Sequence, residues 1–350
     1  MTYKSAAGEP KRGFDPEHIQ LDKINLQVDS IEYNPRRTAL NVSRCSFSER
    51  SGLKMDSLMC KFWMDSTSIH LPEAMFRTPD SYGDAIVDFD LNSFEKGSGG
   101  RMYARFRASL GKQDVITLAG ENLPENVARH YPNVPFNLRA NVDGNADAMD
   151  ITGIYANMKG CLEAKGKAHI RKVMEPEKMY ADAEMTATTG NLKWISAIMP
   201  DVMGDYNLPD GMTLDAHATA DMATESYNAK GVFTEGGGRA TFDALYNGKS
   251  ESYTANLDIK DINVHHFMPK EAMYTFSGNV EARGKGTDVY SAATHAEAKA
   301  HISKLHYDKY HLDKIDFNAT YANNHYKVSA DTDNKLIAIK ANAEGDLKKD

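Results

Sequence analysis

The strongest constraint on this chain is a strict alternation of apolar and polar residues. In the stretch YTANLDI at 253–259 every second residue is apolar, which points successive side chains to opposite faces of a pleated strand. The same pattern recurs at 24–28, 87–91, 102–108, 136–142, 214–220, 315–321 and 337–343. Turn-forming pairs such as Asn34-Pro35, Asn247-Gly248 and Asn323-Asn324 lie between such stretches. The pattern predicts an all-β chain built as an antiparallel sheet.

Three short helical segments, each ending in a proline, interrupt the strands. They are expected at 121–132, 191–200 and 261–269, and the terminal prolines are 68 and 69 residues apart, since proline cannot continue a helix. An alternating strand follows each helix, and AKGKAHI at 164–170 is echoed by AEAKAHI at 296–302. We therefore expect a repeat of about 70 residues that stacks into an elongated body, because one unit cannot bury its apolar face alone.

These features divide the chain into a polar leader or linker at 1–18, a β-sheet segment at 19–120 and repeat units at 121–190, 191–260 and 261–350. Together they are expected to form one continuous β-groove domain. The chain begins in a polar Gly/Pro segment and stops at GDLKKD just after a strand-like stretch. We expect it to be an internal fragment of a longer protein.

Composition excludes several classes of protein. The net charge of −8, from 49 acidic and 41 basic residues without long runs, argues against a nucleic-acid partner, which requires clustered Lys and Arg. No apolar run approaches the roughly 20 residues of a membrane-spanning helix, and the N-terminus has no signal-peptide pattern. Cys45, Cys60 and Cys161 lack a C-x-x-C spacing. We expect mostly free, buried thiols, with a Cys45–Cys60 bridge as the alternative.

Signals for catalysis are missing from the sequence. It contains no G-x-S-x-G elbow, no phosphate-binding loop and no H-E-x-x-H motif. Histidines gather toward the C-terminus without ligand-type spacing, at His265, His266, His295, His301, His306, His311 and His325. We predict a protein that is not an enzyme and that holds no metal and no cofactor.

The apolar face of such a sheet must be covered or must enclose something. Helices are too few to cover it, and small residues such as Ala216, Ala218 and Ala220 line parts of it. Small side chains on a curved apolar wall leave room for a ligand. The alternation leaves two alternatives open: an apolar groove, or a sandwich or barrel whose faces close on each other.

Several segments resemble a known family. They are FSERSGLKMDSL at 47–58, RTPDS at 77–81, and SGNVEARGKGTD at 277–288 with the run that continues through Ile302, Leu305, Tyr307, Tyr310 and Leu312. They resemble the AsmA-like superfamily, and within it the TamB-type translocation and assembly module proteins. The resemblance spans about residues 17–345. The anchor helix and the C-terminal domain of that family are absent from this sequence.

The resemblance implies a long curled β-sheet, a β-taco, in the envelope of diderm bacteria. It implies a periplasmic location, an inner-membrane anchor in the full-length protein, phospholipid acyl chains as ligand, and an outer-membrane barrel assembly protein as a possible partner. The family has no catalytic residues. The lining is expected from the alternating apolar residues Val87, Phe89, Leu91, Phe106, Leu138, Val142, Leu214, Leu257, Ile259, Phe276, Val280, Ile315, Phe317, Ile337 and Ile339.

The alternative function is a secreted or surface β-sandwich or solenoid that binds glycans or acts as an adhesin. In that case aromatic side chains on the polar face, such as Tyr103, Tyr246 and Tyr307, would carry the binding.

Overall fold

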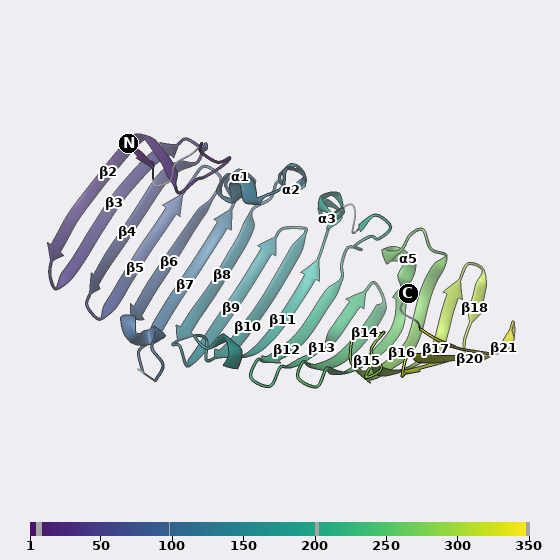
Figure 1. Ribbon diagram of the computed structural model, residues 1–350. Helices are drawn as coiled ribbons and strands as arrows, with labels where there is room; N and C mark the ends of the chain where they lie inside the picture. Colours follow the sequence, from purple (N-terminus) through teal and green to yellow (C-terminus); the bar gives the residue numbers. More distant parts are fainter. Residues whose placement is uncertain (5–8, 98, 200–202, 348–350) are drawn as a thin grey trace. The chain divides into compact units, whose positions relative to one another are not determined.

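The computed structural model describes residues 1–4, 9–97, 99–199 and 203–347. The chain is all-β, and its 21 strands form an antiparallel sheet that is not closed into a barrel (Figure 1). The predicted fold class, an antiparallel curled sheet with short helices, is therefore confirmed, and a closed barrel is not formed. The chain consists of two compact units, Met1–Met174 with Ala197–Met199, and Glu175–Ser196 with Pro200–Asp350.

The N-terminal unit is a meander in which each strand pairs with the next. Its strands are β1 Thr2–Lys4, β2 His18–Asn34, β3 Arg37–Glu49, β4 Lys54–Asp65, β5 Ser68–Arg77, β6 Tyr82–Asp90, β7 Met102–Leu110, β8 Phe136–Gly144, β9 Ala148–Met158 and β10 Leu162–Arg171. β1 lies within the predicted polar leader and pairs with the start of β2.

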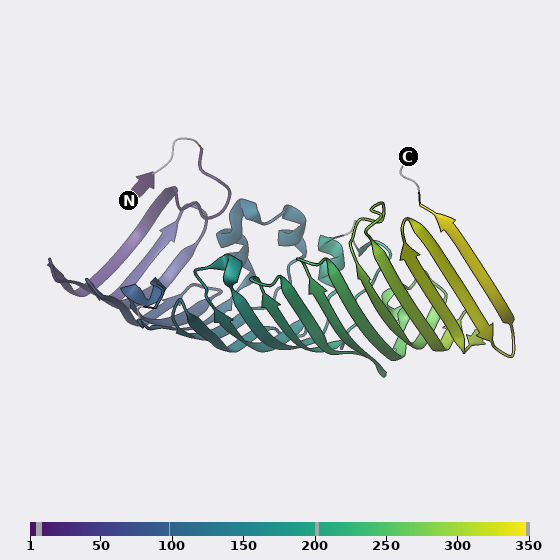
Figure 2. The ribbon, with the colours of Figure 1, turned by 60° about the horizontal axis from the view of Figure 1, so that its bottom comes forward.

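The C-terminal unit is a second meander, with one short extra strand paired to β17. Its strands are β11 Tyr180–Thr189, β12 Thr213–Asp221, β13 Ser226–Glu235, β14 Gly238–Asn247, β15 Ser252–Asn263, β16 Met273–Lys285, β17 His295–Tyr307, β18 Tyr310–Leu312, β19 Ile315–Ala322, β20 His325–Asp333 and β21 Ala338–Asp346. Figure 2 shows that the strands of each unit curve, so that each sheet has a hollow side.

The turns form where the sequence predicts them, because their residues tolerate the required backbone angles. Asn323 and Asn324 join β19 to β20 with φ of 52° and 60°, a region that asparagine enters more readily than most residues. At the β2–β3 turn, the side-chain oxygen of Asn34 accepts hydrogen bonds at 2.9 Å from the backbone N–H groups of Arg36 and Arg37. The predicted meander is thus closed by local side-chain chemistry.

Helices are short and lie between strands. Within the described ranges they are η1 Leu91–Phe94, α1 Lys112–Ala119, η2 Gly120–Asn122, α2 Glu125–His130, η3 Pro176–Lys178, α3 Lys193–Ile198 and α5 Val264–Phe267. The three predicted helical segments each contain a helix, and the Asn191 side chain accepts a hydrogen bond from Lys193 N at 3.1 Å at the start of α3. α1 was not predicted, and Pro200, the expected end of the second segment, lies outside the described residues.

A buried hydroxyl–carboxylate cluster fixes α1 to the β5–β6 turn, within the segment RTPDS. The Asp114 carboxylate, 6% exposed, accepts hydrogen bonds from the hydroxyl groups of Thr78 and Ser81. The Ser81 hydroxyl oxygen in turn accepts from Gly111 N at 2.9 Å. Because a buried carboxylate is costly unless it is hydrogen-bonded, this cluster specifies how the helix and the turn meet.

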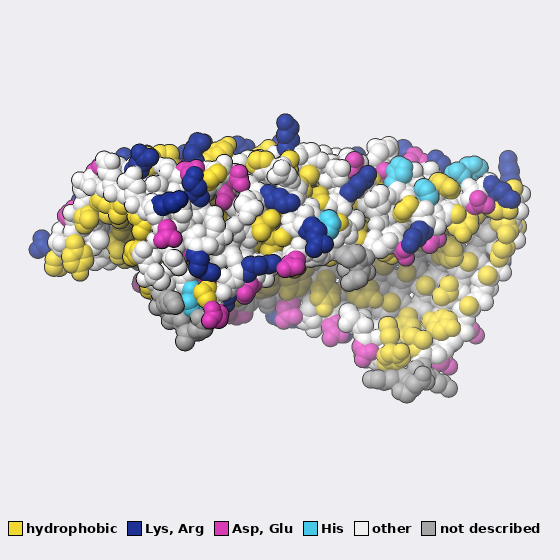
Figure 3. Space-filling model, turned by 90° about the horizontal axis from the view of Figure 1, so that it is seen from above, with side chains coloured by type: hydrophobic (Ala, Val, Ile, Leu, Met, Phe, Trp, Pro, Cys, Tyr) yellow, Lys and Arg dark blue, Asp and Glu magenta, His cyan; other side chains and the backbone are white. Residues whose placement is uncertain are grey.

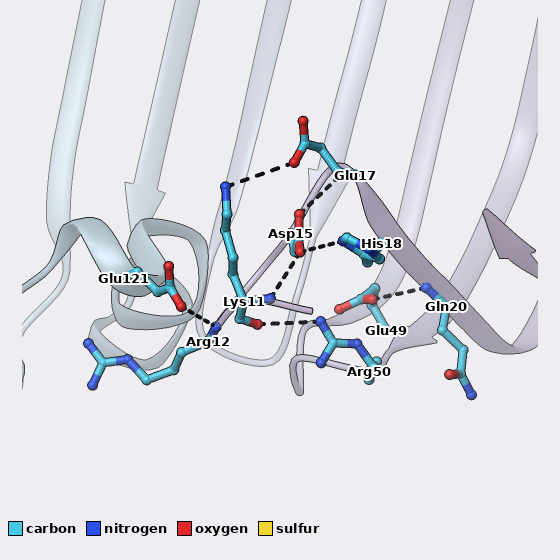
Figure 4. A network of polar contacts seen from close by, with 9 residues as sticks. All are labelled: Lys11, Arg12, Asp15, Glu17, His18, Gln20, Glu49, Arg50 and Glu121. Carbon is cyan, nitrogen blue, oxygen red and sulfur yellow. Dashed lines mark hydrogen bonds and ion pairs between the residues drawn. The ribbon is translucent and has the colours of Figure 1, made fainter. Parts of the chain in front are cut away.

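A second polar network anchors the segment before β2 (Figure 4). The Asp15 carboxylate, 1% exposed, accepts from Lys11 N and Glu17 N at 3.0 Å and lies 2.9 Å from His18 Nδ1. Backbone donation from Lys11 is the main cause that lowers the pKa of Asp15 to about 2. The nearby Glu49 carboxylate accepts from Gln20 N at 3.2 Å. The leader is therefore tied to the sheet by charge-assisted hydrogen bonds.

The buried apolar core is small. Among the described residues, the buried apolar side chains are Val42, Leu53, Ala140, Ala146, Met158, Cys161, Leu192, Met212, Ala240 and Ile262. Cys45, Cys60 and Cys161 are free thiols, so the alternative Cys45–Cys60 bridge is not formed. Cys161 is buried as predicted, whereas Cys45 and Cys60 are half-buried. Burial raises the pKa of the Cys161 thiol, which keeps it in its unreactive protonated form.

Candidate functional site

One face of the C-terminal sheet carries a strip of small side chains. Residues directly opposite each other on neighbouring strands share a face, and the strand register places one small residue from each long strand in a single row. The row is Ala183, Ala218, Ala229, Ala244, Ala255, Ala282, Ala298, Ala319, Val328 and Ala343. We call this row the alanine strip; it runs across the strands rather than along them.

Bulkier rows flank the alanine strip on the same face. On the side toward Tyr253 the row is Ala181, Ala220, Tyr227, Tyr246, Tyr253, Gly284, Ala296, Tyr321, Tyr326 and Gly345. On the other side it is Met185, Ala216, Gly231, Phe242, Leu257, Val280, Ala300, Phe317, Ala330 and Ala341. The small side chains of the strip therefore form the floor of an apolar depression, and the larger side chains of the two flanking rows form its walls.

Several glycines on the apolar faces lie under aromatic rings from a neighbouring strand. A Cβ at Gly231 would lie 2.7 Å from the Phe242 ring, and one at Gly284 would lie 2.6 Å from the Tyr253 ring. In the N-terminal unit a Cβ at Gly83 would clash with the Phe76 ring. Each ring covers backbone that a side chain would otherwise occupy, as in aromatic rescue of sheet glycines.

The alanine strip and the tyrosines line an open hollow of about 570 Å³. Its lining comes from β11 to β15 and is almost wholly apolar: Ala181, Ala183, Ala218, Thr219, Ala220, Tyr227, Asn228, Ala229, Ala244, Leu245, Tyr246, Tyr253, Thr254 and Ala255. The rings of Tyr227 and Tyr246 stack with centroids 6.1 Å apart. A volume in this range, with few polar groups, is typical of sites for apolar small molecules.

The N-terminal sheet has an apolar face of its own, with larger side chains. One row is Leu26, Cys45, Leu58, Phe76, Gly83, Ala108, Leu138, Ala156 and Ala164. A parallel row is Leu71, Val87, Ala104, Val142, Ile151 and Ala168. Phe106 lies between these rows, opposite Ala85 and Ala140, and is 42% exposed.

The residues predicted to line the groove fall largely on these two faces. Val87, Phe89, Phe106, Leu138 and Val142 lie on the N-terminal face, and Leu214, Leu257, Ile259, Phe276, Val280, Ile315, Phe317 and Ile339 lie on the C-terminal face. None of them is buried. Leu91 lies in η1 and Ile337 in the turn before β21, so these two are not strand positions.

Both apolar faces are therefore uncovered among the described residues. Phe317 is 40% exposed and Ile339 is 46% exposed, although large apolar side chains are normally removed from water. Figure 3 shows hydrophobic side chains gathered on a hollowed surface at the C-terminal end, while charged side chains are scattered over the outer surface. Contiguous exposed apolar surface of this kind marks a binding surface.

Two tyrosines of the hollow, Tyr227 and Tyr246, are the part of the site that the alternation did not reveal, whereas Tyr253 belonged to a predicted apolar series. Tyr246 was expected on the polar face, but it lies on the apolar face opposite Tyr227 and Tyr253. The signal was present, because Tyr246 continues the every-second-residue series of Ala244 and Phe242 on β14.

The opposite face of each sheet is polar and carries paired charges. Histidines on it lie beside acids of neighbouring strands: Nδ1 of His70, His169 and His301 lies 2.9, 2.7 and 2.7 Å from a carboxylate oxygen of Asp88, Asp150 and Asp316, respectively. Within the described residues, no group of three or more His, Cys, Asp or Glu side chains is arranged to hold a metal ion. This face holds its histidines in cross-strand pairs.

Comparisons with known proteins do not identify a relative. No protein-family model matches the chain, and searches of curated proteins and of solved structures gave no match. In the part of the chain that the structure describes, none of the helices has the length and apolar character needed to cross a bilayer.

Proposed function

We propose that the apolar faces of this protein hold the acyl chains of phospholipids, and that the protein acts without catalysis in lipid transport between the membranes of a diderm cell envelope, in outer-membrane protein assembly, or in both. The observation that carries the proposal is the uncovered apolar face of the C-terminal unit, with its hollow of about 570 Å³ above the alanine strip.

The chemistry of this face suits alkyl chains. The hollow is lined mainly by methyl groups and aromatic rings, so binding would rest on burial of apolar surface, at about 0.8 kcal/mol for each methylene removed from water. Such burial is not directional. A chain can therefore be held firmly and still shift along the face, as transport requires.

The cellular setting rests on the sequence resemblance to the TamB-type proteins. The resemblance implies a periplasmic location, an inner-membrane anchor in the full-length protein and an outer-membrane barrel assembly protein as a possible partner. Fractionation of cells that express the full-length protein, with immunodetection of the chain in each fraction, tests this setting; a cytoplasmic location would contradict it.

The binding proposal is tested by measuring phospholipid that co-purifies with the protein. Ala255 lines the hollow, and its neighbour Asn256 points to the opposite face of the same strand. We expect Ala255→Arg to reduce bound phospholipid by about tenfold, which corresponds to about 1.4 kcal/mol, because a guanidinium would lie on the apolar face. Asn256→Arg is the matched control and should bind lipid as the wild type does.

The readout is native mass spectrometry together with lipid extraction from protein purified without detergent. Circular dichroism must show the same strand content and melting temperature for both variants. Wild-type protein that carries no acyl chains, or an equal loss in both variants, would contradict the proposal.

A further inference from the structure

The polar face of the N-terminal unit contains a hollow of its own, of about 470 Å³. It lies over β6 to β9 and is lined by Tyr82, Asp84, Arg107, Ala108, Ser109, Asn137, Leu138, Arg139 and Tyr155. Asp84, Arg107, Arg139 and Tyr155 are directly opposite one another on successive strands, so they share the polar face. Ala108 and Leu138 belong by register to the apolar face, but the charged and aromatic side chains of this hollow lie on the opposite, polar face.

Arg139 is the distinctive group in this hollow. Its guanidinium lies over the Tyr155 ring, 4.9 Å from the centroid, a cation–π contact that orients the side chain. Among the described residues, no hydrogen bond or ion pair uses its N–H groups. A guanidinium has five hydrogen-bond donors in a planar fork that suits a carboxylate. The contact with Tyr155 therefore orients Arg139 while its N–H groups remain available to a ligand.

Arg107 lies beside Arg139 and is only partly engaged. Its Nε donates to the two Asp84 carboxylate oxygens at 3.0 and 3.2 Å, and its Nη2 donates to one of them at 3.1 Å. The pairing neutralises Arg107 and holds the Asp84 carboxylate at the hollow. Two guanidinium groups and one carboxylate leave a single positive charge here, which matches a ligand with one negative charge.

Further groups in the hollow favour a ligand with hydroxyl groups over a bare anion. Asp84 can accept hydrogen bonds from hydroxyl groups, whereas it would repel a simple anion. The Asn137 amide and the Ser109 hydroxyl add neutral donors and acceptors, and Tyr82, 57% exposed, contributes an aromatic wall. This combination fits a ring with several hydroxyl groups and one acid group.

A hollow on the polar face of the C-terminal unit provides a contrast. It measures about 320 Å³ and is lined by Thr254, Asn256, Glu281, Ala282, Arg283, Glu297 and Lys299. Glu297 lies 2.9 Å from Arg283 Nε and 3.1 Å from Lys299 Nζ, so both cations are paired. The lining has no aromatic ring, and its two acids balance its two cations. A concave polar surface therefore does not by itself have an unpaired guanidinium, an aromatic ring and a net positive charge, which the hollow around Arg139 has.

We propose that the hollow around Arg139 binds a sugar that carries one carboxylate, with the acid group on Arg139 and the sugar hydroxyl groups on Asp84 and Asn137. The site is independent of the proposed lipid binding, because it uses the opposite face of the sheet. It would give the outer surface of this protein an affinity for acidic polysaccharide.

The test is isothermal titration calorimetry with galacturonic acid, a sugar with one carboxylate, as the probe. We expect binding to the wild type, at least tenfold weaker binding to Arg139→Ala, and unchanged binding to Arg283→Ala, the matched arginine from the paired hollow. Galactose, which lacks the acid group, should bind at least tenfold more weakly than galacturonic acid. Equal melting temperatures of the three proteins would show that the variants are folded.

Other outcomes would overturn the proposal. Absence of binding to the wild type, or equal binding to wild type and Arg139→Ala, would remove the site. Inorganic phosphate binding as tightly as galacturonic acid would show a general anion site and overturn the assignment to a sugar.

Discussion

The two units build the same kind of sheet with different regularity. Among the described residues, register shifts interrupt six of nine strand ladders in the N-terminal unit and two of ten in the C-terminal unit. From β11 to β15 no ladder is shifted. The hollow over the alanine strip lies on these strands and needs this regularity, because each shift displaces a row relative to the next.

The difference shows two ways of holding an open sheet in shape. Shifts and bulges bend strands and increase their twist, and the N-terminal unit combines them with buried polar anchors at Asp114 and Asp15. The C-terminal unit relies on even pairing and on rings that cover glycines. Three substitutions test this contrast.

The largest effect is expected at Gly231 in the regular part of the C-terminal unit. A Cβ there would clash with the carbonyl oxygen of Asp215 and lie 2.7 Å from the Phe242 ring. We expect Gly231→Val to lower the free energy of unfolding by about 3 kcal/mol, measured by urea denaturation. Gly237→Ala is the control, since a Cβ there meets no atom within 4 Å. A decrease in the free energy of unfolding below about 1 kcal/mol would show that the side-chain rows of the C-terminal sheet can shift without loss of stability.

A smaller loss is expected at the anchor of α1 in the N-terminal unit. Asp114→Ala leaves the buried hydroxyl groups of Thr78 and Ser81 without their shared acceptor. Each unsatisfied buried group costs about 1–3 kcal/mol, and we expect a total near 2 kcal/mol because the cluster can relax. Gln113→Ala, at an exposed position of the same helix, should have little effect. Similar stabilities for the two variants would mean that α1 is held by other contacts.

The smallest effect is confined to acid and concerns Asp15. Its pKa is lowered to about 2, with donation from Lys11 N as the main cause, so its charged form stabilises the folded state. This contribution is complete above pH 4 and is lost as pH falls toward 2. Asp15→Asn should therefore flatten the dependence of the N-terminal unit's melting temperature on pH between about 4 and 2.

Tryptophan fluorescence can assign that change to one unit. The chain has two tryptophans, Trp63 on β4 and Trp194 on α3. In a Trp194→Phe background the signal comes from Trp63 alone, which lies in the N-terminal unit. An unaltered pH profile in the Asp15→Asn variant would show that the Asp15 network does not contribute to acid stability.

The sequence predicted which face of the sheet a side chain occupies, but it did not predict which residues lie opposite each other on neighbouring strands. Alternation assigned Leu257, Val280 and Phe317 to one face, and the structure places them in one row. A period of two specifies the face of a residue but not its partner. The hollow over the alanine strip depends on how five strands align, and this depends on turn lengths and bulges that the pattern does not encode.

The errors have similar physical causes. Leu91 and Ile337 continue an alternating series, but the chain has left the strand at both positions. α1 was missed because its eight residues are too few to show a clear helical period beside a strong strand pattern. The stack of Arg139 on Tyr155 could not be predicted, because it joins two strands whose pairing includes a register shift.

The number of hairpins in the C-terminal sheet determines the length of the alanine strip. Each hairpin adds two small residues to the strip, as β13 and β14 do with Ala229 and Ala244. Removal of that hairpin would bring β12 next to β15 in the same antiparallel sense, with Ala218 opposite Ala255. Gene duplication or deletion of whole hairpins could thus change the length of the strip in steps of two strand spacings, about 10 Å, while its cross-section stays the same.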